Sequence, residues 1–332
     1  MIPLFLLTGF LGSGKTTLLS RLIRSDGFRD TAVIINEFGA VGLDHVLVAK
    51  GEESRALLLD SGCLCCAMDG SLATTLERLY YDRERGEIPR FDRVVIETSG
   101  LAEPGLIVNA LHIDRFMARR FSLAGIIVTV DAVFGPRQLQ EFVEASVQLA
   151  MADRVILTKI DLADADLREQ ARSAIRALNP HASLFEAAGG NLDAARLLDT
   201  SGLRGDGLAD TPHGHEDGHD HHHEHDHIHA HGIAARVLHC PQTVSWTSYA
   251  DWVRFLQSGL GSRLLRLKGI LRLEDGQPHA VHGVQHLFSP PETLSAATPS
   301  EIIGNVVLIA RDVGDDEIQA AAQLIGAAVI RA

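Results

Sequence analysis

Apolar and polar residues follow one another along the first two hundred positions in blocks that predict strands and helices in turn. Short continuous apolar runs are typical of strands buried on both faces, and they occupy residues 2–8, 31–36, 93–97, 125–130, 155–158 and 183–186. Apolar residues at helical spacing predict helices between them, over residues 14–25, 71–83, 138–151 and 165–178. This alternation predicts a three-layer α/β domain with a mostly parallel sheet, whose ligand lies at the carboxyl ends of the strands.

The pattern changes after residue 200. Residues 201–233 are rich in histidine and acidic residues and predict a disordered linker. In the part that follows, two runs resemble strands, at residues 235–240 and 264–273. Two other stretches resemble amphipathic helices, at residues 248–259 and 316–329. We therefore expect an α/β domain over residues 1–200, a linker over residues 201–233, and a smaller α+β C-terminal domain over residues 234–332.

The first predicted strand leads directly into a glycine-rich loop. Residues 9–16, GFLGSGKT, match the pattern G-x-x-x-x-G-K-[ST] between a strand and a helix, which is the context that this phosphate-binding motif requires. Backbone N–H groups of such a loop surround phosphates, and the helix N-terminus adds the positive end of its dipole. We expect Lys15 to reach the β- and γ-phosphates and Thr16 to bind Mg²⁺. The other nucleotide-binding residues of this loop are expected to be Gly9, Gly12, Ser13, Gly14 and Thr17.

A second buried run ends in an acidic residue. The stretch RVVIE ends at Glu97 and continues as TSGLAEP. Glu97 is the candidate acid that assists Mg²⁺ or the attacking water, and Gly100 is the candidate backbone sensor of the γ-phosphate. Lys15 and Glu97 are thus the expected catalytic residues. The alternative is that Glu97 is an ordinary exposed carboxylate at a strand end.

A third run, VILTKID, carries a candidate for base recognition. Asp161 is placed to accept both N–H donors of guanine, and Lys159 is expected to lie along the base. Thr158 stands where asparagine is the more common residue, so the preference for guanine rests mainly on Asp161. These residues make GTP the expected nucleotide.

Composition and charge disfavour several classes of protein. The chain has 332 residues, of which 46% are hydrophobic, and its formal net charge is −13. This charge disfavours nucleic acid as a partner, because phosphates are repelled without a basic cluster. No apolar run approaches the roughly 20 residues needed to span a membrane, and the N-terminus lacks the basic region of a signal peptide. We expect a cytoplasmic protein with reduced cysteines.

Three of the four cysteines lie within four positions, as Cys63, Cys65 and Cys66 in GCLCC. Thiolates suit zinc, and also copper(I) or cobalt. Glu37 is the candidate further ligand, and the alternative is a set of buried, apolar-like cysteines. Glu37 and Asp44 belong to a stretch where GTPases carry a switch segment, and Asp44 is a candidate Mg²⁺ ligand or simply a loop residue.

Five motifs in this order, GFLGSGKTT, NEFG, GCLCC, ETSG and TKID, resemble those of the CobW-type metal-handling GTPases. The resemblance is strong up to about residue 161 and weaker in the C-terminal part. It implies GTP binding, slow GTP hydrolysis and delivery of a transition metal to a client metalloprotein. Zinc is the expected metal, with cobalt or nickel delivery for cofactor or metalloenzyme maturation as the alternative. A homo-oligomer is compatible with the resemblance.

The linker contains a second candidate metal site. Within residues 213–231, ten of nineteen residues are histidine, five are acidic and none is basic. Neutral imidazoles bind zinc, nickel, cobalt or copper, so we expect this run to collect metal with less selectivity than the cysteines. A plain solvated linker is the alternative. The histidines are His213, His215, His219, His221, His222, His223, His225, His227, His229 and His231.

Two other classes of protein compete with a GTP-dependent metallochaperone. A non-catalytic metal store or sensor needs neither Lys15 nor Glu97. A small-molecule kinase needs neither the T-K-x-D motif nor C-x-C-C. We expect GTP hydrolysis to act as a switch that drives release of the metal to a client.

Overall fold

The computed structural model describes residues 1–35, 45–48, 57–60, 71–187, 192–199, 230–295 and 297–330, of which 45–48 and 57–60 are described by their backbone alone. The chain divides into two compact units. The first comprises residues 1–138, 152–172 and 183–203, and the second comprises residues 139–151, 173–182 and 204–332. The sequential domain boundaries expected from the sequence remain a prediction.

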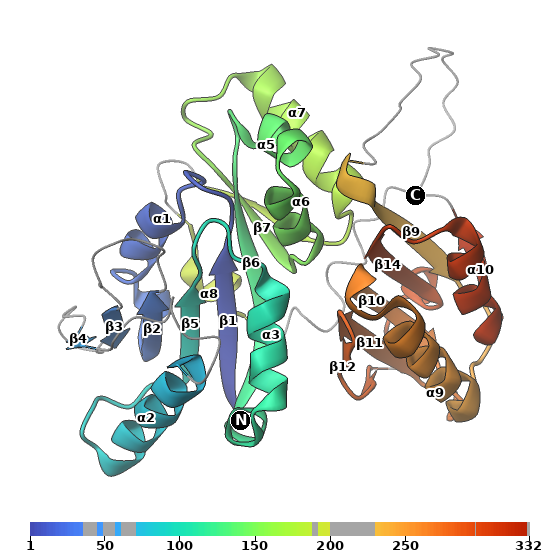
Figure 1. Ribbon diagram of the computed structural model, residues 1–332, viewed down its shortest axis with the longest axis horizontal. Coiled ribbons are helices and arrows are strands. Elements are labelled where there is room, and N and C mark those ends of the chain that lie inside the picture. The colour runs from blue at the N-terminus through green and yellow to red at the C-terminus, as the bar shows by residue number, and fades with distance from the viewer. Residues whose placement is uncertain are drawn as a thin grey trace. The chain divides into compact units, whose positions relative to one another are not determined.

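The first unit is built on an eight-stranded sheet in the order β4-β3-β2-β5-β1-β6-β7-β8 (Figure 1). Six neighbouring strands are parallel: β2 (Thr31–Ile35), β5 (Arg93–Glu97), β1 (Ile2–Thr8), β6 (Phe121–Asp131), β7 (Arg154–Thr158) and β8 (Ser183–Glu186). An antiparallel hairpin extends one edge, with β3 (His45–Val48) beside β2 and β4 (Leu57–Asp60) beside β3. The predicted P-loop α/β fold is confirmed, whereas the hairpin was not predicted.

Strand register brings the functional segments to one edge of this sheet. Leu7 of β1 pairs with Glu97 of β5, and Thr8 pairs with Val128 of β6. On the next strand, Asp131 of β6 pairs with Thr158 of β7. Because these strands are parallel and buried, the four segments that follow them leave the sheet side by side.

Helices occupy the connections between the strands. They are α1 (Lys15–Leu22), α2 (Ser71–Arg85), α3 (Pro104–Ile113), α4 (Arg115–Arg120), α5 (Gly135–Glu141), α6 (Val143–Ala150), α7 (Ala165–Leu178) and α8 (Ala194–Leu197). The single helix predicted over residues 138–151 is wrong, because the backbone is extended at Phe142 and separates α5 from α6. The Ser146 hydroxyl of α6 donates to the Leu139 carbonyl of α5 (2.6 Å), a contact that local periodicity does not reveal.

The second unit contains a largely antiparallel sheet in the order β12-β11-β10-β14-β9-β15, with β13 paired to β11. The strands are β9 (Ile233–His239), β10 (Leu264–Arg272), β11 (Pro278–Val284), β12 (Leu287–Phe288), β13 (Glu292–Thr293), β14 (Asn305–Arg311) and β15 (Ala328–Ile330). The helix predicted over residues 316–329 is too long. Helix α10 covers Asp315–Leu324, and Gly326, at φ +65°, turns the chain into β15.

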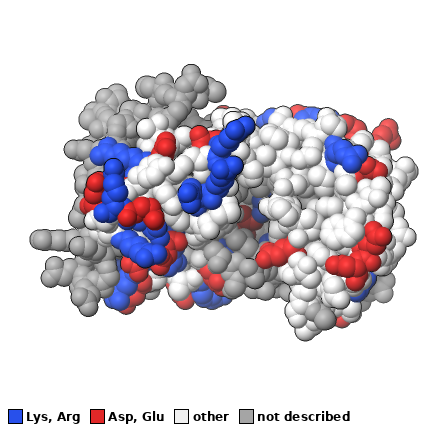
Figure 2. Space-filling view, turned by 90° about the horizontal axis from the view of Figure 1, so that it is seen from below, with Lys and Arg blue, Asp and Glu red and all other residues white. Residues whose placement is uncertain are grey.

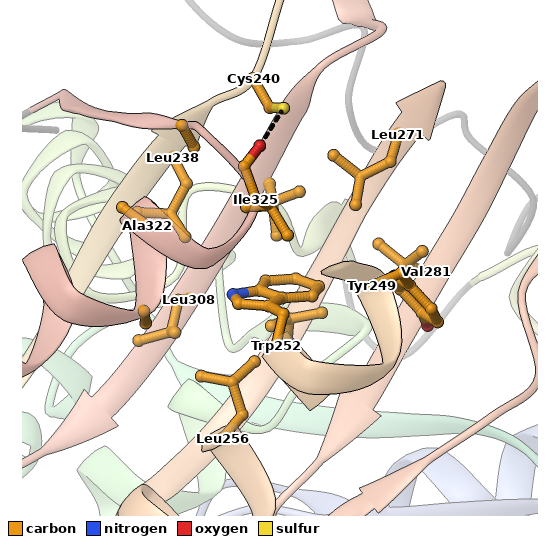
Figure 3. Close-up of a cluster of buried hydrophobic side chains, with 14 of the residues drawn as sticks. Leu238, Cys240, Tyr249, Trp252, Leu256, Leu271, Val281, Leu308, Ala322 and Ile325 are labelled. Carbon is orange, nitrogen blue, oxygen red and sulfur yellow. Dashed lines mark hydrogen bonds between the residues drawn. The ribbon is translucent and has the colours of Figure 1, made fainter. Parts of the chain in front are cut away.

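The core of the second unit forms around Trp252 of α9 (Trp246–Phe255), which is fully buried (Figure 3). Leu271 and Leu308 reach the same cluster from the sheet, and Ala322 reaches it from α10. Burial of a large apolar side chain contributes about 1.5–3 kcal/mol. This cluster therefore attaches both helices to the sheet.

Acidic side chains lie among the basic ones on the face shown in Figure 2. Charges at the end of α2 are paired, since Arg85 contacts Asp82 at 2.6 Å and Glu87, just after the helix, at 3.1 Å. Exposed ion pairs of this kind contribute about 0–1 kcal/mol, so burial of apolar residues dominates the stability. Among the described helices, none combines the length and the apolar composition needed to cross a membrane.

Candidate functional site: the loop after the first strand

The segment after β1 folds into a tight loop before α1. Gly9 has a φ of +142°, and a Cβ atom there would lie 2.3 Å from Thr129 Oγ1, so only glycine fits. The Ser13 N–H donates to the Phe10 carbonyl (3.1 Å) and closes the loop. Gly14 then begins α1 in the left-handed region, at φ +91°. The result is a short backbone ring at the N-terminus of a helix, the geometry that holds phosphate groups.

Lys15 turns toward this ring. It is the first residue of α1 and is 8% exposed. Its Nζ donates to the carbonyl of Gly9 (2.7 Å) and to the carbonyl of Phe10 (3.2 Å). The ammonium group therefore lies at the loop, where it would contact the phosphates of a bound nucleotide. Gly12, at φ +73°, lies on the exposed side of the same loop, and Thr17 is exposed on α1.

Thr16, in the first turn of α1, contacts Glu97 at the end of β5. The Thr16 hydroxyl donates to Glu97 Oε1 (2.6 Å), although the two residues are 81 positions apart in the sequence. Glu97 is 3% exposed, so it is not the exposed strand-end carboxylate that the sequence left open as an alternative. Gly100 is also buried, and a Cβ atom there would lie 2.9 Å from the backbone of Leu11. The segment after β5 therefore packs directly on the phosphate-binding loop.

The segment after β7 carries the candidate base-recognition residues. Lys159 has a φ of +55°, and its Nζ lies 2.6 Å from Asp131 Oδ2. Asp161 is exposed two residues further on. Thr158 is buried, and its hydroxyl donates to the carbonyl of Ser13 in the loop (2.7 Å). Strand β7 thus places the T-K-x-D motif next to the phosphate-binding loop.

Two residues of this site were not predicted from the sequence. Asp131, at the end of β6, is 1% exposed, and its Oδ1 accepts hydrogen bonds from the N–H groups of Val133 and Phe134. Thr129 of β6 is 1% exposed and lies under the loop. The acidic residue at the end of the run GIIVTVD was the available signal for Asp131. Nothing in the sequence distinguishes Thr129 from other strand threonines.

The predicted transition-metal ligands fall largely outside the described residues. These are Glu37, Cys63, Cys65 and Cys66, together with the histidines from His213 to His229. The candidate Mg²⁺ ligand Asp44 lies outside the described residues as well. His231 is described: it lies in the turn Ala230–Gly232 with φ +62°. Within the described part of the chain, no group of three or more His, Cys, Asp or Glu side chains is arranged to hold a metal ion.

A parallel sheet with a glycine loop, a loop lysine and an acid at the end of a neighbouring strand defines the class of P-loop nucleoside-triphosphate hydrolases. Comparison with known families agrees with this class. Residues 3–186 match the family described as CobW/HypB/UreG, nucleotide-binding domain, and residues 233–323 match the cobalamin synthesis protein CobW C-terminal domain. The chain belongs to the CobW family and is a P-loop GTPase.

Several relatives are similar over most of the chain. The zinc chaperone YjiA of Escherichia coli is 34% identical over 292 residues, covering 87% of each chain. The zinc-regulated GTPase metalloprotein activator 1 of Schizosaccharomyces pombe is 28% identical, covering 94% of this chain and 82% of the relative. The crystal structure of Zn(II)-bound YjiA GTPase from E. coli matches with a TM-score of 0.69 and 29% identity, covering 98% of both chains.

Proposed function

We propose that this protein is a metallochaperone that binds zinc and transfers it to a client metalloprotein under the control of GTP binding and hydrolysis. The observation that carries the nucleotide half is the 2.6 Å contact between Thr16 and Glu97 beside the phosphate-binding loop. The similarity to a zinc chaperone over 87% of both chains supports the metal half.

In this proposal each residue of the loop has a defined role. The backbone of Gly9, Gly12, Ser13 and Gly14 surrounds the phosphates, with Thr17 beside them at the start of α1. Lys15 neutralises charge on the β- and γ-phosphates. Glu97 orients the attacking water, and Gly100, which packs against Leu11, follows the γ-phosphate through its N–H group. Lys159 and Asp161 bind the guanine base, and Thr158 connects their segment to the loop.

The Thr16 hydroxyl and the Glu97 carboxylate fit Mg²⁺, which prefers oxygen ligands and commonly uses few protein groups in addition to phosphate oxygens. Both oxygens lie at the loop, next to the N-terminus of α1. Bound there with GTP, Mg²⁺ would neutralise charge on the phosphates. Asp44 is proposed as an additional ligand of this ion.

Zinc is the proposed cargo, with Cys63, Cys65, Cys66 and Glu37 as its ligands. Thiolate ligands favour zinc, and an incomplete ligand shell favours transfer over permanent binding. A zinc-bound crystal structure of a YjiA triple mutant, in which one glutamate and two cysteines are alanine, matches this chain with a TM-score of 0.70 and 26% identity. Zinc therefore binds that relative even in the mutant. The histidines of residues 213–231 are proposed to collect metal separately, because neutral imidazoles bind zinc.

Cobalt and nickel remain the alternative cargoes, because imidazole and thiolate groups bind both. The residues around the second unit's sheet are proposed to recognise the client. A cytoplasmic location is also proposed, because thiols such as those of Cys63, Cys65 and Cys66 are kept reduced there.

The proposal is tested by GTP turnover on metal-stripped protein, measured without metal and then with zinc, cobalt or nickel. We expect one metal, zinc, to change the rate, and we expect the variant Cys63→Ser/Cys65→Ser/Cys66→Ser to lose this response. Zinc stoichiometry is measured in parallel, because the histidine run is expected to retain zinc when the cysteines are absent.

Cys240→Ser is the matched control. This thiol is buried, donates to the Ile325 carbonyl (3.0 Å), and burial raises its pKa above the ordinary value (Figure 3). Cys240 is therefore not expected to bind zinc, and its variant should respond to zinc as the original protein does. Turnover that ignores both metal and cysteines would contradict the coupling between cargo and nucleotide.

A further inference from the structure

Five buried hydroxyl groups are linked by hydrogen bonds under the phosphate-binding loop, two of these links running through the backbone carbonyls of Thr8 and Ser13. They come from the ends of four neighbouring strands and from the loop itself. Each is 7% exposed or less. We call this network the hydroxyl ladder, and its members are Thr98, Thr8, Thr129, Ser13 and Thr158.

Thr129 lies between Ser13 and Thr8 in this ladder. Its hydroxyl oxygen lies 2.7 Å from Ser13 Oγ, where either hydroxyl can donate, and 3.3 Å from the Thr8 carbonyl. At one end the Thr158 hydroxyl donates to the Ser13 carbonyl (2.7 Å) and lies 3.2 Å from the Val130 carbonyl.

The other end of the ladder reaches the segment after β5. The Thr98 hydroxyl donates to Thr8 Oγ1 (2.8 Å) and lies 3.3 Å from the Ser99 carbonyl. Thr98 directly follows Glu97, whose carboxylate accepts from Thr16. The ladder therefore connects the segment that carries the base-recognition residues, the phosphate-binding loop and the segment that carries the catalytic acid.

Thr129 occupies the centre of the ladder. A Cβ atom on Gly9 would lie 2.3 Å from Thr129 Oγ1 and 2.8 Å from Ser13 Oγ, so these groups fill the space under the loop. Removal of the Thr129 hydroxyl would leave the buried hydroxyl of Ser13 and the carbonyl of Thr8 without this partner. Because a buried polar group is destabilised when it loses its hydrogen-bond partner, this change would destabilise the native conformation of the loop.

We infer that Thr129 is a positioning residue, which sets the shape of the phosphate-binding loop and couples it energetically to Thr158 in the base-recognition segment. This inference rests on the nucleotide site assigned under the proposed function. It is independent of the metal, because every member of the ladder lies within the described residues of the first unit.

The test is a double-mutant cycle on the full-length protein, measured as the dissociation constants of GDP and of a non-hydrolysable GTP analogue in metal-stripped buffer containing Mg²⁺. We expect Thr129→Val and Thr158→Val each to weaken binding by about tenfold. The double variant should lose clearly less than the product of the two single losses, because both residues hold Ser13, Thr129 at the Ser13 hydroxyl and Thr158 at the Ser13 carbonyl. A loss of about a hundredfold in the double variant means independent sites and overturns the inference.

Conservative variants separate positioning from general destabilisation. Thr129→Ser keeps the hydroxyl and should bind nucleotide within about threefold of the original protein. In steady-state turnover, Thr129→Val should raise KM for GTP more than it lowers kcat, because the ladder shapes the loop in both the ground and the transition state. Failure of Thr129→Ser to restore binding contradicts the role of the hydroxyl.

Thr31→Val is the matched control, since Thr31 is equally buried but lies at the amino end of β2, away from the loop. It should leave nucleotide affinity unchanged. If Thr129→Val does not fold, Ser13→Ala interrupts the same bond from the other side and should also weaken binding about tenfold. Unchanged affinity in Ser13→Ala overturns the inference. Because zinc is absent throughout, a failure of the metal proposal leaves these outcomes intact.

Discussion

At the residue scale, the Asp131 side chain binds both the start of the segment after β6 and the ammonium group of Lys159. Its Oδ1 accepts from two backbone N–H groups at the start of the next segment, and its Oδ2 holds the ammonium group of Lys159 at 2.6 Å. The carboxylate is almost fully buried, whereas the Lys159 side chain is 34% exposed. Asp131 therefore fixes the position of Lys159.

Asp131→Asn tests this role. The amide keeps an oxygen for the two backbone N–H groups but loses the charge that faces Lys159. Charged hydrogen bonds contribute about 1.5–3 kcal/mol, so we expect GTP and GDP to bind about tenfold more weakly, as measured by calorimetry. Asp26→Asn is the control, because it breaks an exposed ion pair with Arg29 and should not change affinity. Unaltered affinity in Asp131→Asn would show that Lys159 does not depend on Asp131.

At the scale of single elements, the two wrong helix predictions have related causes. Helix α10 stops before Gly326, whose positive φ starts the turn into β15. Helices α5 and α6 separate at Phe142, where Ser146 binds the carbonyl of Leu139. In both places apolar periodicity continues through the break. Periodicity reports which face is buried, but it does not report where the backbone changes direction.

The start of α10 gives a prediction about acid stability. Arg263 contacts both oxygens of Glu317 (2.7 and 3.1 Å), and the Gly314 N–H donates to the same carboxylate (3.3 Å). The hydrogen bond from Arg263 holds the pKa of Glu317 below its ordinary value. A lowered pKa in the folded state means that the stabilisation is present above the ordinary pKa of glutamate and is lost as the pH falls through the lowered value.

Glu317→Gln should therefore lower the unfolding temperature slightly at neutral pH, and this difference should shrink as the pH falls below about 4. The effect is small because the pair is exposed. Thermal unfolding of both proteins from pH 7 to pH 3 measures it. Asp251→Asn, which breaks an exposed pair with Arg254 on α9, is the control. A difference that stays constant across this range contradicts the assignment of the pKa shift to Arg263.

At the scale of the whole molecule, the proposed function requires energetic linkage between nucleotide and zinc. If GTP changes the affinity for zinc, zinc must change the affinity for GTP by the same factor. We expect zinc affinity to differ by at least about fivefold between protein loaded with GDP and protein loaded with a non-hydrolysable GTP analogue.

Competition with a chelator of known affinity measures this difference in the full-length protein. The variant with Cys63, Cys65 and Cys66 changed to serine should lose the difference, while Cys240→Ser should retain it. Equal zinc affinity in both nucleotide states would contradict the hypothesis that hydrolysis drives metal release, even if zinc still binds to the histidine run.

The sequence by itself determined the fold class and the identity of the loop residues. The glycine spacing of residues 9–16 and the buried runs around them are local signals, because backbone geometry and strand burial are set by residues that lie close together in the chain. Glu97 and Asp161 were predicted in the same way, from their places at or just after the ends of apolar runs. The order of the motifs then indicated the family.

Tertiary structure alone decided which distant side chains meet. Thr16 and Glu97 are 81 positions apart, and Ser13 and Thr158 are 145 positions apart, yet each pair forms a hydrogen bond. Such contacts depend on strand order and register, which the sequence of a single strand does not encode. For this reason the contacts of Thr129 and Asp131 with their neighbours across the sheet became visible only once β6 was placed between β1 and β7.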